Sequence, residues 1–335
     1  MDSWDGYTSA EVVNYWPTQD PFPGIISSPP RTGSGCFKPA VSGQYRNFPG
    51  QSAVVVGVAY NPAVLGSNVF QFLLGGINGT IQVSLRVAFN GVLYIQRGFS
   101  GPIIATTDPS LALIPTIYDF IEWKTGFTHS SYNEIRVNGQ VLFTGTLDCQ
   151  NGLLSGADTA VLFGLAGGSV ALYDDFYLLS QDGLGAHDFL GDTSIICCIP
   201  SADGTYVEWT PGGPGHSTQH YKNVAEIPAD GDNSYNASAG SGTRDTYVVN
   251  HALNSTDSIQ GVQMTQLVHD IDGDNEQARP YISVAGTNYF TSSDNYIAPA
   301  TYIPAQLKEY DVDPTTGAPW LPSRFNNTVW GIQQV

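Results

Sequence analysis

Apolar residues in this chain come in short stretches that are rich in Val, Ile, Tyr and Phe and are ended by Gly, Pro, Asn or Asp. Such runs predict β-strands, and no stretch keeps the 3.6-residue periodicity of an amphipathic helix. Within 81–87 apolar and polar residues alternate strictly, so we expect one buried face made of Ile81, Val83, Leu85 and Val87. The pattern predicts strands at 53–59, 69–74, 81–89 and 93–97.

Two Asn-Gly pairs predict tight turns. Asn90-Gly91 lies just before the strand at 93–97, and Asn138-Gly139 separates strands expected at 133–137 and 140–143. Asn-Gly is the preferred dipeptide of the type I′ hairpin, because both central residues need a positive φ. We therefore predict a meander or sandwich that closes a first domain near residue 190, with its last strands at 160–165 and 170–179.

After Asp192 the chain is richer in Gly, Asp, Asn and Ser, and its apolar stretches are shorter. This composition predicts loops between short strands at 193–199, 246–249, 260–269 and 281–284. The predicted fold class is all-β, with strands in at least about 40% of the chain, well above the usual share. Two sandwiches are expected to meet within 188–193.

The composition is that of a folded protein of about two domains, because 335 residues exceed the common domain size of roughly 150. The chain is 41% hydrophobic and only 13% charged, which argues against disorder. Its 12 basic and 30 acidic residues give a net charge of −18, which repels phosphates and anionic lipids. We expect neither nucleic acid nor membrane as a partner.

No apolar run of about 18 residues is present, as a membrane-spanning helix would need. Residues 1–7 also lack the basic and apolar regions of a secretion signal. We therefore expect a protein that neither spans a membrane nor follows the usual secretion route.

Four cysteines are too few for a disulfide framework and have no CxxC spacing for zinc. Cys197 and Cys198 are expected to be strand neighbours that face opposite ways, one of them packing with Ile195 and Ile199, and not to bond each other. Buried thiols are the simpler interpretation. The sharper hypothesis is that a disulfide or inter-subunit contact involves at least one of Cys36, Cys149, Cys197 and Cys198.

Two clusters of acidic residues are candidates for a metal site or a catalytic site. The loop from Asp270 to Glu276 offers oxygen ligands, but its spacing does not match a calcium loop, so we favour a polar hairpin tip without a metal. Asp174 and Asp175 could do acid–base chemistry on sugars. Neighbours on a strand point to opposite faces, however, so only one of the two could enter a cleft. We favour a structural role for this pair.

Other chemistry has weaker support. His216 and His220 are four residues apart, but Pro214-Gly215 before them argues against a helix that would align them on a metal. We find no P-loop, nucleophile elbow or dinucleotide fingerprint. Some aromatic side chains could serve recognition, although core packing explains most of them; they are Tyr7, Tyr15, Trp16, Tyr289, Phe290 and Tyr296.

Three segments resemble a known fold family. They are FIEWK at 120–124, NEIRVNG at 133–139 and YDDFY at 173–177. In this order they are similar to the concanavalin A-like lectin/glucanase jelly roll as it occurs in phage virion proteins. The resemblance covers roughly residues 1 to 190.

A second motif series continues along the chain, with FLGD at 189–192, PSADG at 200–204, WTP at 209–211, PADGDNSY at 228–235 and DPTTGAPW at 313–320. This series resembles a group of tailed-phage structural proteins in which it directly follows the jelly roll. Cys197-Cys198 departs from the pattern, in which apolar and charged residues are expected. The resemblance implies a particle component and does not imply catalysis, because lectin-like sandwiches host binding, enzymatic and architectural roles.

We therefore expect a jelly-roll domain at 1–190 and a smaller β-sandwich domain at 191–335. The expected function is that of a non-enzymatic virion component, such as a neck, collar or tail-associated appendage or a head decoration. It would pack against copies of itself and other virion proteins. No catalytic, cofactor-binding or metal-ligating residue and no cofactor are expected.

Two alternatives stay open. The first is a carbohydrate-binding module of a receptor-binding fibre, which would hold a host glycan on aromatic platforms and acidic loops. The second is a glycan depolymerase, which would need two carboxyl groups about 5 to 9.5 Å apart across a cleft. The sequence offers no pair that stands out for the second role.

Overall fold

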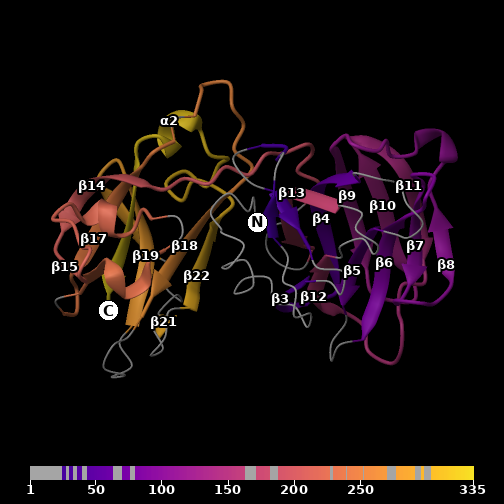
Figure 1. Cartoon of the computed structure of the whole chain (residues 1–335), viewed down its shortest axis with the longest axis horizontal. Helices are drawn as coiled ribbons and strands as arrows, with labels where there is room; N and C mark the ends of the chain where they lie inside the picture. The colour runs from indigo at the N-terminus through magenta and orange to yellow at the C-terminus, as the bar shows by residue number, and fades with distance from the viewer. Residues whose placement is uncertain are drawn as a thin grey trace. The chain divides into compact units, whose positions relative to one another are not determined.

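The structure of the protein is a computed structural model, shown in Figure 1. It describes residues 25–27, 30–32, 36–39, 44–62, 70–75, 80–162, 171–181, 188–226, 229–238, 240–251, 253–269, 277–290, 296–297 and 303–335. Strands make up 52% of the protein and helices 6%, which confirms the all-β prediction. The chain divides into two compact units, Met1–Cys197 and Cys198–Val335, whereas the sequence placed the boundary after residue 190.

The first unit contains two antiparallel sheets. Seven strands form one sheet in the order β1 (Ile25–Ser27), β2 (Cys36–Lys38), β13 (Ala171–Ser180), β4 (Ala53–Pro62), β9 (Asp119–Gly126), β10 (Ser131–Val137) and β11 (Gln140–Leu147). Six form the other in the order β3 (Gln44–Gln51), β12 (Ala157–Leu162), β5 (Phe70–Gly75), β6 (Ile81–Val87), β7 (Leu93–Arg97) and β8 (Ile103–Thr106). A short 3₁₀ turn, η2 (Pro109–Leu111), follows β8.

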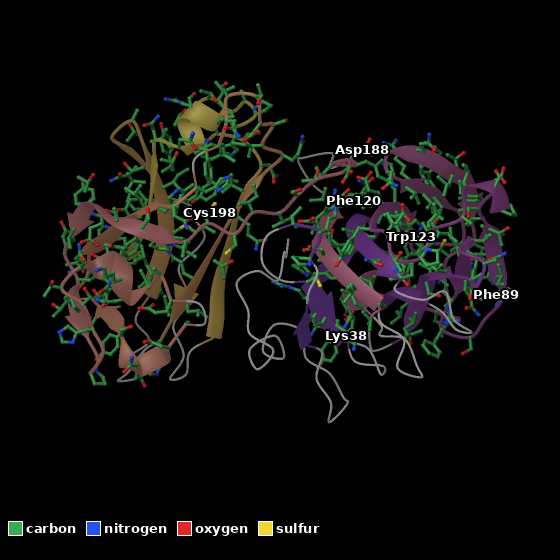
Figure 2. All side chains as sticks on the ribbon, turned by 45° about the horizontal axis from the view of Figure 1, so that its top comes forward. Lys38, Phe89, Phe120, Trp123, Asp188 and Cys198 are labelled. Atoms are coloured by element: carbon green, nitrogen blue, oxygen red, sulfur yellow. The ribbon has the colours of Figure 1, made fainter. Side chains whose placement is uncertain are left out.

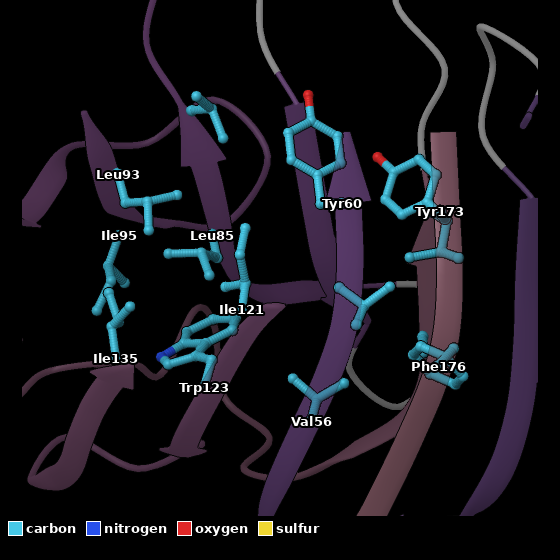
Figure 3. Packing of buried hydrophobic residues seen from close by; sticks show 14 of the residues in the cluster. Val56, Tyr60, Leu85, Leu93, Ile95, Ile121, Trp123, Ile135, Tyr173 and Phe176 are labelled. Carbon is cyan, nitrogen blue, oxygen red and sulfur yellow. The ribbon is translucent and has the colours of Figure 1, made fainter. Parts of the chain in front are cut away.

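The core of this unit lies between the two sheets. Alternate residues of β4 face it, and Trp123 of β9 is fully buried beside Ile121. Figure 3 shows these side chains next to Leu85, Leu93 and Ile95 from the opposite sheet. On β6 the predicted face is confirmed for Val83, Leu85 and Val87, whereas Ile81 is partly exposed. The neighbouring residues of β4 and β9 therefore point to the outer face of the seven-stranded sheet.

The two Asn-Gly turns differ. Asn138 (φ 50°) and Gly139 (φ 77°) join β10 to β11 as a two-residue turn, as predicted. Between β6 and β7, however, only Gly91 has a positive φ, and five residues separate the strands. The prediction of a type I′ turn at Asn90-Gly91 is wrong because Ala88 and Val92 form a backbone hydrogen bond, Ala88 N to Val92 O, that widens the loop.

The second unit is built on one larger antiparallel sheet. Its order is β14 (Pro200–Val207), β17 (Arg244–Val249), β23 (Thr328–Gln334), β19 (Gln277–Val284) and β20 (Thr287–Phe290), and β21 (Tyr296–Ile297) also pairs with β19. Two pairs accompany it: β15 (Thr210–Gly212) with β16 (Tyr235–Ala237), and β18 (Val262–Val268) with β22 (Ile303–Tyr310). Short turns are η4 (His220–Asn223), η5 (Gly231–Asn233) and α2 (Pro322–Phe325).

One face of this sheet carries the core of the second unit. Ile282 and Trp330 lie on it, and Trp320 stacks on Trp330 with ring centroids 6.4 Å apart. Val262 and Met264 of β18 pack against the same cluster, so the β18–β22 pair covers this face. The opposite face is the outer face of the unit.

The segment 193–199 is not a strand, which corrects the sequence prediction. It runs without ladder partners; side chains of the first unit bond to its backbone at Thr193 and Ile195, and Asn250 bonds to its backbone at Ile199. The other strands expected in this half are found, at β17, β18 and β19.

Candidate functional site

A short segment lies on the outer face of the seven-stranded sheet. Residues 188–195, here called the strap, include Phe189 and Leu190, which pack on Val55, Ala59 and Phe120. Figure 2 labels Asp188 and Phe120 in this region. The strap contains the FLGD motif and is the last part of the first unit before the second begins. The face beneath it is therefore covered by the chain itself.

A buried carboxyl group holds the middle of the strap. Glu122 of β9 is fully buried, and its Oε1 accepts hydrogen bonds from the Tyr177 hydroxyl and from Gly191 N, the latter 2.8 Å away. The Tyr177 oxygen in turn accepts from Leu190 N at 3.2 Å. Gly57 lies directly opposite Tyr177 on β4, and a Cβ there would be 2.2 Å from the ring, so only glycine leaves room for it.

Basic side chains hold the start of the strap. Lys124 Nζ lies 3.3 Å from Asp188 Oδ1, and the guanidinium of Arg136 lies 3.8 Å from the centre of the Phe189 ring. Lys124 and Arg136 belong to β9 and β10, on the same face as Glu122. The strap therefore crosses these strands and is attached to each of them.

Asp174 and Asp175 hold the end of the strap and a segment from the N-terminal part. Asp174 Oδ2 accepts from the backbone N–H groups of Arg31 at 2.8 Å and Thr32 at 3.2 Å. Asp175 accepts from Thr32 Oγ1 at 2.9 Å, Arg31 Nη1 at 3.0 Å and Ile195 N at 2.7 Å. Arg31 also pairs with Asp192 and donates to the carbonyl of Thr193.

This arrangement corrects the expectation that the two acids point to opposite faces. The register of β13 shifts between Asp174 and Tyr177, and Asp175 has φ 52°, so the strand bulges there. Both carboxyl groups turn to the same neighbours as a result. They are fully buried and occupied by N–H and O–H donors, which supports the structural role favoured for them.

The two acids differ from ordinary surface carboxylates in their pKa. Burial and the neighbouring Asp175 charge raise the pKa of Asp174 to about 7, although three backbone N–H groups oppose the shift. Burial also raises the pKa of Asp175, with Ile195, Thr32 and Arg31 opposing it. The ionised pair is therefore costly to bury, and the donors offset only part of that cost.

In the second unit, His220 belongs to a buried polar network. Its Nδ1 lies 2.9 Å from Asp245 Oδ2, and the hydroxyl of Tyr247 donates to the same oxygen at 2.8 Å. Asn236 Nδ2 donates to the His220 carbonyl and to Tyr247. Burial raises the pKa of Asp245, and the bonds from His220 and Tyr247 oppose the shift.

The two histidines singled out from the sequence are not brought together. His216 is exposed and its Nδ1 bonds to the carbonyl of Gly213 at 2.6 Å, whereas His220 faces Asp245. Within the described ranges, no group of three His, Cys, Asp or Glu side chains is placed to hold a metal ion. The loop Asp270 to Glu276 lies outside the described residues, as do Tyr7, Tyr15 and Trp16.

The cysteines occupy different environments. Cys36 and Cys149 are buried in the first unit, and Cys149 Sγ accepts from Asn133 Nδ2 at 3.2 Å. Burial raises the pKa of the Cys149 thiol. Cys197 is exposed, and Cys198 packs on the core of the second unit. The strand geometry expected for this pair is wrong, because 193–199 is not paired in a sheet.

The outer face of the six-stranded sheet is polar and partly buried. Gln82 Oε1 accepts from Asn151 N at 2.7 Å, and Ser84 Oγ donates to the carbonyl of Gly98 at 3.0 Å. Gln82 Nε2 and Gln96 Oε1 are buried, and neither has a hydrogen-bond partner among the described residues. Beside them, Phe99 is 46% exposed.

None of the described helices is long and apolar enough to cross a membrane. No family model matches the chain, and no curated protein is similar to it in sequence.

Several solved structures match about half of the chain, at low sequence identity and with low TM-scores. A sialidase matches at 12% identity and TM-score 0.40, over 54% of this chain and 18% of its own. An endo-β-1,4-glucuronan lyase from Trichoderma reesei matches at 10% identity and TM-score 0.38, over 50% of this chain and 92% of its own. A protein of unknown function with a galectin-like fold from Bacillus subtilis matches at 10% identity and TM-score 0.34, over 47% of this chain and 87% of its own.

The chain is all-β and its first unit is built from two antiparallel sheets that enclose a core, which agrees with the fold class predicted from the sequence. One expectation is corrected. The chain was expected to be non-enzymatic, yet the solved structures that match it include a sialidase and polysaccharide lyases. Non-enzymatic function therefore does not follow from this architecture.

Sequence reasoning missed Glu122, Gly57 and Arg31. Glu122 was visible as an acid between the apolar residues Ile121 and Trp123, and a charge at a strand position next to buried residues is a signal for a covering segment. Gly57 and Arg31 become meaningful only once the register of β4 with β13 is known.

Proposed function

We propose that the chain is a structural component of a tailed-phage virion that acts through contacts with copies of itself and with other virion proteins. A neck, collar, tail-associated or head-decorating position would all suit it. The motif series supports this proposal, because it resembles that of phage structural proteins. The low-identity neighbours do not bear on it.

The proposal rests on one observation: residues of the motifs are buried and form hydrogen bonds within the fold. In the first unit, Glu122, Asp174 and Asp175 are buried and bonded to the strap or to residues 31–32. In the second, Asp203 Oδ1 accepts from Tyr221 N at 2.6 Å beside the His220–Asp245 pair. The motifs therefore build a rigid scaffold, which is what a particle component requires.

The test is the composition of purified particles. The tailed phage that encodes this chain would be purified by density gradient, and the chain sought by mass spectrometry and traced by electron cryomicroscopy. The proposal expects a fixed copy number per particle and density that fits both units. A chain that stays in the soluble lysate and is missing from infectious particles would refute it.

A cross-linked oligomer stays a prediction within this proposal. Cys197 is exposed and could reach a cysteine of another subunit after release from a reducing cytoplasm. Particles would be run on a denaturing gel with and without reductant. Migration of the chain as a monomer in both lanes would rule out inter-subunit disulfides.

A second candidate function is glycan binding on the outer face of the six-stranded sheet. In the described part of the chain, Gln82 Nε2 and Gln96 Oε1 have no hydrogen-bond partner but are inaccessible to solvent, so the side chain of this face that a sugar could reach is Phe99, which is 46% exposed. A glycan array with the purified chain, followed by an assay for cleavage of any bound polysaccharide, tests binding and turnover together. Binding that survives Phe99→Ala would exclude this face.

A further inference from the structure

Two arginines lie in one row on the outer face of the second unit's main sheet. Arg244 on β17 is directly opposite Gln333 on β23, which is directly opposite Arg279 on β19. Residues paired in this way point to the same face. Adjacent strands are about 4.8 Å apart, so the backbones of the two arginines are about 10 Å apart. We call these three residues the arginine row.

Aromatic rings fix both guanidinium groups. Arg244 lies 3.5 Å from the centre of the Tyr206 ring, and Arg279 lies 4.3 Å from that of Phe290. Gln333 Oε1 accepts from Arg279 Nε at 3.2 Å and Nη2 at 2.9 Å. Stacking and these bonds limit the rotation of each side chain, so less conformational entropy is lost when a partner binds.

The charges of the row are poorly balanced. Arg244 Nε forms a long ion pair with Glu208 Oε2 at 3.8 Å, and the same oxygen accepts from Arg244 N at 2.9 Å. Among the described residues, the only polar partner of Arg279 is the neutral amide of Gln333. The whole chain has 12 basic and 30 acidic residues, so Arg279, whose charge no acid balances in the described part of the chain, is a local positive site on an acidic protein, and Arg244 beside it is only partly neutralised.

Tyr281 lies beneath this row. Gly331 is directly opposite it, and a Cβ there would be 2.8 Å from the Tyr281 ring, so the glycine leaves the space in which the ring lies across β23. The ring packs on Phe290 with centroids 4.7 Å apart. Its hydroxyl is fully buried, and in the described part of the chain neither it nor Arg244 Nε has a hydrogen-bond partner.

We propose that the arginine row is a self-association surface that receives carboxylate side chains from a second copy of this chain. The proposal rests on the proposed function only in that it assumes contacts between copies. Charge complementarity points to the occupant: each copy has 30 acidic against 12 basic residues, so carboxylates that could face the row outnumber cations on a second copy.

The chemistry of the row suits such a contact. Half-buried arginines with planar, pre-oriented guanidinium groups bind carboxylates with two parallel hydrogen bonds. Arg, Tyr and Phe are also the residues enriched in the centres of protein interfaces. Two acids about 10 Å apart on the partner, as on alternate strands or on a loop, would match the spacing.

The test is sedimentation velocity of the purified full-length chain from about 1 to about 100 µM, in about 50 mM and about 500 mM NaCl. Because two copies of net charge −18 also repel each other, and more strongly at low salt, the effect of the row is measured as the difference between wild type and the arginine variants at each salt concentration. Arg279→Gln and Arg244→Gln are each expected to weaken association about tenfold or more. Lys222→Gln removes one exposed charge of the same unit outside the row, and it is expected to change association less than about twofold.

Two results would overturn the proposal: a wild-type chain that stays monomeric throughout, or arginine variants that associate like wild type while circular dichroism shows them folded. Binding of a polyuronate that Arg279→Gln abolishes, without self-association, would instead assign the row to an acidic glycan and also overturn it. The proposed function fails separately, when the chain is missing from purified particles. A monomeric chain that is nevertheless present in particles overturns this inference alone.

Discussion

A tyrosine lies over a glycine on the outer face of the main sheet in each unit, yet the two tyrosines have different surroundings. Tyr177 is directly opposite Gly57, and its hydroxyl bonds to Glu122 and Leu190 N. Tyr281 is directly opposite Gly331, and its hydroxyl has no partner among the described residues.

The difference comes from what covers each face. In the first unit the strap supplies N–H donors to the Tyr177–Glu122 pair, so the polar groups of that face are satisfied by the chain's own residues. In the second unit no such segment bonds to Tyr281 within the described ranges, and two arginines flank it instead. The same local device thus closes one face and leaves the other able to accept a partner.

Asp175→Ala should uncover the first face and have the largest effect. It removes the acceptor of Arg31, Thr32 and Ile195 and leaves the partly buried Arg31 guanidinium with Asp192 as its remaining acid partner. Breaking a buried ion pair on one side costs about 3 to 5 kcal/mol, and the remaining Asp192 places the expected cost near the lower value. Urea unfolding of the first unit measures it, and strap cleavage by protease should accelerate.

Asp108→Asn is the control for that experiment, because Asp108 is an exposed acid of the same unit that caps a short turn, and Asn caps nearly as well. It is expected to leave the urea midpoint of the first unit essentially unchanged. Equal effects of the two substitutions would show that the strap attachment is not specific.

Gly57→Ala should push Tyr177 away from Glu122, because the added Cβ would lie 2.2 Å from the ring. Overpacking of this kind costs about 1 to 3 kcal/mol. Gly331→Ala, with a contact of 2.8 Å, should cost less. Gly50→Ala meets nothing within 4 Å and is the control. We expect thermal unfolding to show the largest fall in melting temperature for Gly57→Ala, a smaller fall for Gly331→Ala and the smallest for Gly50→Ala. A reversed order would contradict the role of the two tyrosines.

The folding stability of the first unit should depend on pH through the buried carboxyl group of Asp174. Its pKa in the folded protein is about 7, above the ordinary value of 3.8. Between these values the folded state holds a proton that the unfolded state has lost, so protonation favours folding. This contribution is complete below about pH 4 and disappears as the pH rises through about 7.

We therefore expect the unfolding midpoint of wild type, relative to Asp174→Asn, to fall as the pH is raised from about 5 to about 8. Asn cannot titrate, so the difference between the two proteins isolates this group. A difference that stays constant with pH, or that grows in the other direction, would show that Asp174 is ionised throughout.

Removal of the two tyrosine hydroxyl groups is the prediction with the smallest expected effect. Tyr177→Phe loses hydrogen bonds with Glu122 and Leu190 N and is expected to cost about 1 to 2 kcal/mol. Tyr281→Phe removes a buried hydroxyl without a partner and should be neutral or slightly stabilising. Chemical unfolding of both variants measures the contrast, and equal costs would mean that the two faces do not differ as described.

The sequence predicted individual strands better than it predicted how those strands connect and pair. Alternation identified Val83, Leu85 and Val87 as core, because a strand has a fixed two-residue period that needs no knowledge of its partner. Asn138-Gly139 formed the predicted turn, but Asn90-Gly91 did not, because the Ala88–Val92 hydrogen bond closes a wider loop there. Turn type depends on where the flanking strands stop pairing, which local sequence does not specify.

The candidate sites depend on the register between strands that are far apart in the chain. Sequence reasoning did not predict that register, because it is set by contacts outside each strand. A bulge turned Asp174 and Asp175 to the same neighbours, and one-residue shifts of this kind are invisible to alternation. The pairing of Arg244 and Arg279 across Gln333 joins strands far apart in the chain. Tyr289-Phe290 was noticed as a possible recognition feature, and Phe290 does flank the arginine row.

The position of the strap also has a mechanical consequence. A pull on the chain beyond residue 195 would not reach the end of β13 first, because Ile195 is bonded to Asp175 and Gly191 to Glu122. The load would pass into the bulge of β13 and the interior of β9, and through Arg31 into the N-terminal segment. Several bonds would then have to break together rather than strand by strand, so the first unit should resist traction along the chain better than its sheet alone.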